Sequence, residues 1–68
     1  MIGSDALSLK TRETVYKIVD ASPGLHFREI QRRTGLAIGS LQYHIEYLEK
    51  YHLIKVQQDG KYTRYYSI

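Results

Sequence analysis

An Asp-Gly pair near the C-terminus constrains the fold of this chain more than any other feature. Asp59-Gly60 separates two segments, 53–58 and 61–68, in which apolar and polar residues alternate. This combination predicts a β-hairpin closed by a two-residue turn. Because an isolated hairpin is marginally stable in water, the rest of the chain must provide a surface for it to pack against.

The two faces of the predicted hairpin differ in chemistry. With Asp59-Gly60 as the turn, Ile54 opposes Tyr65 and Val56 opposes Thr63, which makes one face apolar. The other face is cationic and aromatic and carries Lys55, Gln57, Tyr62, Arg64 and Tyr66. We therefore expect the apolar face to cover the core and the other face to remain in solvent.

The chain is short, which limits the size of its core. Its 68 residues make one domain, and a domain of this size buries only about 60% of the surface of its unfolded chain. It has no cysteine, which excludes disulfides and thiolate zinc sites. The sequence also lacks a catalytic constellation, a metal-ligand spacing, a phosphate loop and a long apolar run. We expect a cytoplasmic, non-enzymatic domain without cofactor, metal or membrane contact.

Helical periodicity precedes the hairpin. Apolar residues recur at helical spacing over 8–21, and Ser22-Pro23-Gly24 ends this first helix. The short polar stretch before it predicts a loose N-terminal segment at 1–7 and a folded domain at 8–68.

Two further helices are expected at 27–34 and 38–51, separated by Gly35, which suits a left-handed helix cap. Residues 25–27 form either a brief third strand or the lead-in to the second helix, and we expect the strand. The core-facing stripe of the third helix is predicted to be Leu41, Ile45, Leu48 and His52. Three tyrosines are expected at the core or its edge: Tyr16, Tyr51 and Tyr65.

The positive charge is concentrated in two segments. The chain carries a net charge of +3, with +2 over 26–34 and +2 over 53–68, whereas 36–52 carries −1. A basic excess of this kind suits a polyanionic partner.

Three helices followed by a two-stranded ribbon form the plan of an α+β winged helix-turn-helix domain. The residues that carry a family resemblance are Pro23-Gly24-Leu25-His26-Phe27-Arg28-Glu29-Ile30, Thr34-Gly35-Leu36, the run from Gly39 to Glu49, Leu53-Ile54, and the run from Asp59 to Tyr66. In the order and spacing of these motifs, the chain resembles the archaeal winged helix-turn-helix transcriptional regulators related to the ArsR-like group.

The resemblance implies that the chain binds double-stranded DNA, with the third helix in the major groove. The hairpin, which is called the wing in this fold, would lie on the DNA backbone. It implies base contacts from Gly39, Ser40, Gln42, Tyr43, Glu46 and Tyr47. The candidates for backbone contacts are Arg28, Arg32, Arg33, Lys55, Lys61, Tyr62 and Arg64. Gln42 can pair with adenine through two hydrogen bonds, and Tyr43 can pack on a thymine methyl group.

A second function remains open, because winged helices also serve as non-catalytic protein-interaction modules in replication or transcription assemblies. The third helix offers only Lys50 as a cation and exposes Glu46. The sequence stops soon after the wing, without the further helix through which ArsR-like regulators dimerise. We therefore expect a monomer, a weak homodimer or a part of a larger protein, with no small-molecule effector.

Overall fold

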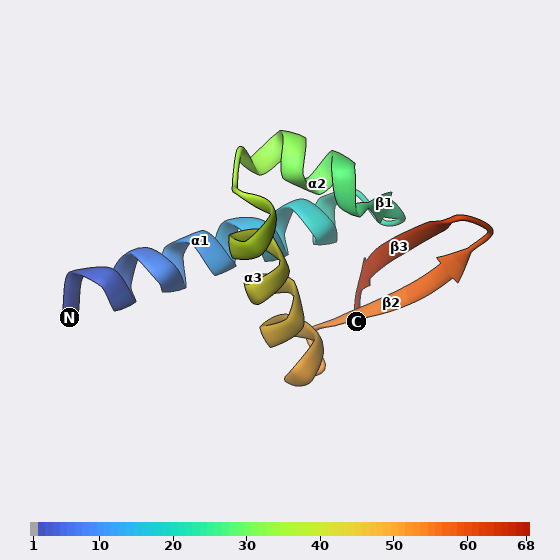
Figure 1. The fold of residues 1–68 in the computed structure, drawn as a ribbon. Helices are drawn as coiled ribbons and strands as arrows, with labels where there is room; N and C mark the ends of the chain where they lie inside the picture. The colour runs from blue at the N-terminus through green and yellow to red at the C-terminus, as the bar shows by residue number, and fades with distance from the viewer. Residues whose placement is uncertain (1) are drawn as a thin grey trace.

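The computed structural model describes the backbone of residues 2–68 and the side chains of residues 9–68. Along the chain the elements are α1 (Ile2–Ala21), β1 (Leu25–His26), α2 (Phe27–Thr34), α3 (Ile38–Lys50), β2 (Ile54–Asp59) and β3 (Tyr62–Ser67). Figure 1 shows the hairpin of β2 and β3 extending beside the three helices. This arrangement is the predicted α+β winged helix-turn-helix fold.

The first helix is longer than its periodicity indicates. α1 begins at Ile2 rather than at Ser8, and its N-terminal half projects beyond the other elements (Figure 1). Met1 lies outside the described residues, and a domain boundary at residue 8 remains a prediction. Further along α1, Val15 and Val19 are fully buried and anchor the helix to the core. Within residues 2–68 no helix combines the length and apolar character needed to cross a bilayer.

The turn between α2 and α3 follows the predicted chemistry. Gly35 adopts a left-handed conformation with φ 71°, and its N–H donates a hydrogen bond to the carbonyl oxygen of Gln31 at 2.8 Å. The backbone N–H of Leu36 donates to the Thr34 hydroxyl at 3.3 Å. A residue without a Cβ takes this conformation without strain, so Gly35 ends α2 and reverses the chain into α3.

The hairpin turn lies one residue later than predicted. Asp59 pairs with Tyr62, which leaves Gly60 and Lys61 as the two turn residues. Gly60 has φ 61°, and Lys61 has no positive φ. A positive φ at the first central residue alone is the pattern of a type II′ turn, which prefers glycine there. Gly60 therefore occupies the first turn position, not the second.

The shifted turn changes the strand register. Val56 opposes Tyr65 and Ile54 opposes Ser67, so the predicted pairs of Ile54 with Tyr65 and of Val56 with Thr63 are wrong by two residues. A shift of two keeps every side chain on its predicted face, because side chains alternate with a period of two. The expected third strand is present: β1 pairs antiparallel with β3, and the strand order is β1-β3-β2.

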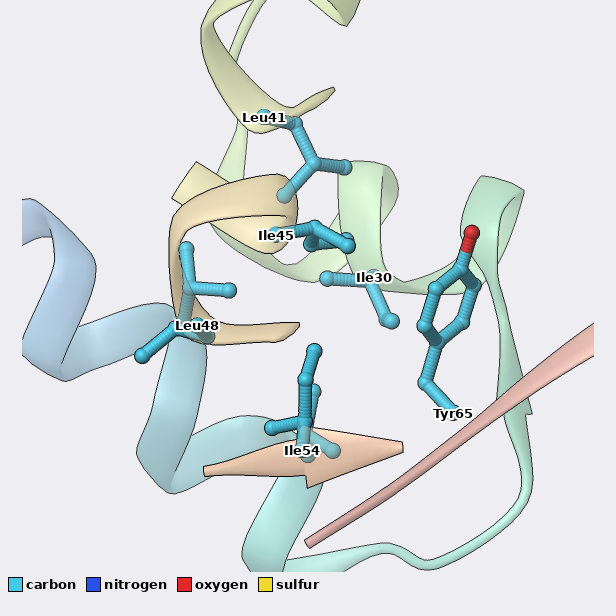
Figure 2. Packing of buried hydrophobic residues seen from close by; sticks show 8 residues of the cluster. Ile30, Leu41, Ile45, Leu48, Ile54 and Tyr65 are labelled. Carbon is cyan, nitrogen blue, oxygen red and sulfur yellow. The ribbon is translucent and has the colours of Figure 1, made fainter. Parts of the chain in front are cut away.

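The core lies where the three helices meet the sheet. Figure 2 shows its members from α2, α3 and both hairpin strands: Ile30, Leu41, Ile45, Leu48, Ile54 and Tyr65. Two predicted core positions are wrong. His52 is exposed in a left-handed conformation with φ 60°, just after α3 ends, and Tyr51 is also exposed. The helical stripe stops at Leu48, and His44 takes the fourth buried position on α3.

Candidate nucleic-acid interface

The outward face of α3 presents most of the residues predicted to contact bases. Gly39, Ser40, Gln42, Tyr43 and Glu46 are all exposed. Nothing lies within 4 Å of the Cβ position at Gly39, so another molecule could approach the backbone closely there. The Gln42 side-chain amide donates a hydrogen bond to the Glu46 carboxylate at 3.2 Å. This bond fixes a donor and an acceptor side by side on the helix.

The sixth predicted base-contact residue, Tyr47, lies under a side chain of α1. The Arg12 guanidinium sits 3.6 Å from the centre of the Tyr47 ring and 5.7 Å from that of Tyr43. Tyr47 also packs on Tyr51, with ring centres 4.6 Å apart. Tyr47 is therefore half-buried, while Tyr43 is 56% exposed.

His44 follows Tyr43 in α3 but is not exposed to solvent as Tyr43 is. It is buried, its Nδ1 has no hydrogen-bond partner within residues 9–68, and its ring meets Tyr43 edge-on at 5.2 Å. Burial, and then the positive charge of Arg12, lower the pKa of the His44 imidazole below its ordinary value of 6.5. The neutral form therefore suits this site.

The three arginines of α2 differ in what they contact. Glu29 accepts hydrogen bonds from Arg32 at 3.1 Å and from Arg33 at 2.9 Å, and Arg33 also donates to the Ser22 hydroxyl at 3.1 Å. These bonds, and then the positive charges, lower the Glu29 pKa from 4.5 to about 2. Arg28 is exposed. Two of the three predicted backbone-contact residues on α2 therefore already have a carboxylate partner.

The cations of the wing also differ in what they contact. Lys55 and Lys61 are exposed. The Arg64 guanidinium, in contrast, donates hydrogen bonds to the Asp59 carboxylate and to the Gly24 carbonyl oxygen, both at 2.8 Å. Arg64 thus holds the wing against the loop after α1, a structural role that sequence reasoning missed.

A groove joins the start of α2 to the wing. It has a volume of about 310 Å³, and Arg28 and Lys61 are among its lining residues. Tyr62 lines the same groove: its ring packs on His26 with ring centres 5.4 Å apart, and the Lys61 ammonium lies 5.8 Å from its centre. Two cations without an ion-pair partner among residues 9–68 and an aromatic ring, all from the predicted backbone-contact set, therefore meet at one place.

A second groove, also of about 310 Å³, separates α3 from the sheet. Gln42 and Glu46 form its rim on α3, and Ile45, Val56 and Tyr65 contribute apolar side chains. This groove has no cation among its lining residues. Across residues 9–68, no three side chains of the metal-binding types gather closely enough to hold an ion.

The sequence carries no nucleic-acid signal in its first helix, because the charges there cancel. Arg12, Lys10 and Lys17 are balanced there by acidic neighbours. The position of Arg12 beside Tyr43 and Tyr47 depends on how α1 crosses α3. Neither charge counting nor periodicity within one helix gives that crossing.

Comparison with known proteins gives the same fold. Residues 9–68 match the family HTH_HVO_0163_N, described as an N-terminal HTH domain. A stretch of 56 residues, 82% of the chain, is 34% identical to the uncharacterized HTH-type transcriptional regulator MJ1398 of Methanocaldococcus jannaschii, and it spans only 14% of that protein.

Two crystal structures share the architecture. That of the transcriptional regulator SlyA aligns with a TM-score of 0.73 at 22% identity, over 84% of this chain and 42% of the other. That of a predicted DNA-binding transcriptional regulator from E. coli aligns with a TM-score of 0.74 at 24% identity, over 97% of this chain and 75% of the other. At these identities the likeness is one of fold.

Proposed function

Because this chain belongs to the HTH_HVO_0163_N family of N-terminal HTH domains, we propose that it binds double-stranded DNA as the DNA-reading part of a transcriptional regulator. In this proposal α3 enters the major groove, and the wing contacts the sugar-phosphate backbone. The domain adds no catalytic step. It acts in the cytoplasm, where it reaches the DNA.

The observation that carries the proposal is the exposed face of α3. Gly39 allows close approach, Tyr43 projects into solvent, and the Gln42 amide is held beside the Glu46 carboxylate. Donors and acceptors of this kind read base edges: an amide pairs with adenine, and a carboxylate accepts from the cytosine amino group. We propose Ser40, Gln42, Tyr43 and Glu46 as the base-reading residues.

For contacts to the DNA backbone we propose the cations that have no carboxylate partner among residues 9–68. Arg28 and Lys61 line one groove beside Tyr62, and Lys55 lies further along the wing. Arg32, Arg33 and Arg64 would have to leave hydrogen bonds to Glu29, Asp59 or Gly24 before binding a phosphate. We therefore assign the last three residues a weaker share of the phosphate contacts.

The proposal also covers the subgroup of regulators to which the chain belongs and the partners that it binds. Placement among the ArsR-like regulators is supported by the residue pattern from Pro23 to Tyr66. The partner besides DNA is either a second copy in a weak homodimer or the remainder of a longer regulator. The second arrangement is supported by the relative MJ1398, of which the matched stretch is only 14%. We propose no small-molecule effector for this domain.

Titration of labelled duplexes with parent and variant proteins tests the DNA-binding proposal. Selection from random duplexes first supplies a preferred site. Tyr43→Ala should cost about 1 to 3 kcal/mol of binding free energy at that site and less on random duplex, because base contacts carry the specificity. Gln42→Ala should lose most at one base pair. Leu41→Ala, on the buried side of the same turn, should instead cost about 2 to 5 kcal/mol of folding stability.

A second candidate function is protein binding, and one observation favours it. The rim of the groove between α3 and the sheet carries Gln42, Glu46 and Glu49 but no cation, and its floor is apolar. Such a groove repels phosphate and accepts an apolar side chain with a basic neighbour. Absence of duplex binding at low salt would favour this function over DNA binding. A Tyr43→Ala protein that binds every duplex as tightly as the parent would favour it as well.

A further inference from the structure

We propose that Arg12 of α1 is a phosphate-binding residue of the DNA interface, held in place by its stack on Tyr47 of α3. The proposal rests on the DNA-binding function argued above, and it adds a contact from a helix whose charges cancel in the sequence. In this arrangement phosphate contacts flank α3 on two sides, with Arg12 on one and the wing on the other.

The geometry fixes the guanidinium beside the recognition helix. Its carbon atom lies 3.6 Å from the centre of the Tyr47 ring, close enough for stacking, and 5.7 Å from that of Tyr43. Tyr43 is one of the proposed base-reading residues, so the positive charge lies next to the surface that would face DNA. A stacked guanidinium is also pre-organised, because it loses little further freedom when an anion binds.

Arg12 differs in its hydrogen bonds from Arg32, Arg33 and Arg64, each of which has a carboxylate partner. Its Nε is buried without a partner. Its two terminal nitrogens are not among the fully buried unpaired atoms, and within residues 9–68 they take part in no hydrogen bond or ion pair. The terminal nitrogens of a stacked guanidinium can bind two phosphate oxygens at once. The terminal donors of Arg12 are therefore not used by any acceptor within residues 9–68.

Charge on α3 gives a separate argument. The outward face of this helix carries Glu46 and Glu49, and its only cation is Lys50 in the last turn. Two carboxylates near the groove of a polyanion are repelled unless a cation lies close by. Arg12 brings a second positive charge to the middle of the helix, beside Tyr47 and Tyr43. This position resolves the mismatch between an acidic recognition helix and a DNA partner.

Replacement of Arg12 should change the salt dependence of binding. We expect Arg12→Met to weaken binding to preferred and random duplexes by the same factor, and to reduce the slope of log affinity against log salt by about 1. Arg12→Lys keeps the charge and should keep the slope. The matched control is Lys17→Met, which removes one charge from the exposed side of the same helix, where Lys17 pairs with Glu13 at 3.4 Å. This control should bind with the slope of the parent.

The possible outcomes separate this inference from the function on which it rests. A parent protein without salt-dependent duplex binding would overturn both. A parent slope that survives Arg12→Met, or falls equally in Lys17→Met, would overturn the Arg12 contact alone. A loss confined to the preferred site with an unchanged slope would mean that Arg12 only positions Tyr43, and would also overturn it. Thermal melts check that each variant folds, and Arg12→Gln replaces the Met variant if that one does not.

Discussion

The Arg64 guanidinium donates a hydrogen bond to the carbonyl oxygen of Gly24 at 2.8 Å, across 40 residues of sequence. The backbone N–H of Gly24 in turn donates to the carbonyl oxygen of Tyr65 at 2.9 Å. Together these bonds fasten the middle of β3 to the loop that ends α1. The wing of this domain is therefore joined to the helices by specific polar bonds as well as by the apolar core.

Arg64 and Lys61 should separate folding from binding within the wing. Arg64→Ala should lower the free energy of unfolding by about 1 to 2 kcal/mol, because it leaves the Gly24 carbonyl oxygen and the Asp59 carboxylate without their donor. Lys61→Ala should change it by less than about 0.5 kcal/mol, because Lys61 is an exposed turn residue. Urea unfolding of both variants measures the difference. Equal stabilities would contradict the structural role of Arg64.

Two glycine-to-alanine substitutions should have opposite effects on stability. Gly60→Ala should destabilise the domain by about 1 kcal/mol, because an alanine at φ 61° is strained. Gly39→Ala should stabilise it by about 0.5 kcal/mol, because α3 favours alanine and the Cβ position meets nothing within 4 Å.

The Gly39 variant also tests the interface. If DNA approaches α3 closely at this residue, Gly39→Ala should weaken binding to all duplexes while it raises the melting temperature. Melting curves and duplex titrations on the same samples show whether the two effects diverge. Unchanged affinity would mean that the helix backbone stays clear of the groove at Gly39.

The sequence predicted the elements of the fold well because each has its own local signal. Gly35 marks the end of α2, Asp59-Gly60 marks the hairpin, and helical spacing places Leu41 and Ile45 in the core. The register failed by two residues because the same Asp-Gly pair suits two turn types, and the strands have equally good alternation in either pairing. The faces were still correct, because both registers have the same parity.

The candidate site was less predictable, since it depends on which cations find partners in the fold. Counting charges gives Arg28, Arg32 and Arg33 the same status, yet the carboxylate of Glu29 binds two of them. Arg12 carries no signal in the sequence because its contact to Tyr47 crosses from one helix to another. Such contacts follow from helix packing, which residue spacing within one segment does not specify.

The ion pairs of Glu29 should make the stability of the fold depend on pH in the acidic range. The folded-state pKa is lowered from 4.5 to about 2, so folding favours the carboxylate. This contribution is complete above pH 4.5 and is lost as the pH falls from there toward 2. Melting temperatures measured across that range should fall less steeply in Glu29→Gln than in the parent. Parallel curves for the two proteins would show that the bonds to Arg32 and Arg33 add nothing to stability.

His44 should give a second pH dependence at higher pH. Its pKa is lowered in the folded protein, first by burial and then by the charge of Arg12, so the unfolded chain binds a proton more readily. The stability contributed by the neutral ring is therefore present above pH 6.5 and declines as the pH falls below it. His44→Leu should remove this decline below pH 6.5, as measured by urea unfolding at each pH. Arg12→Met should reduce it, because the ring then loses a nearby positive charge, and NMR titration of the His44 ring should show its pKa moving toward 6.5. A midpoint that stays in place in Arg12→Met would show that burial alone sets the protonation of His44.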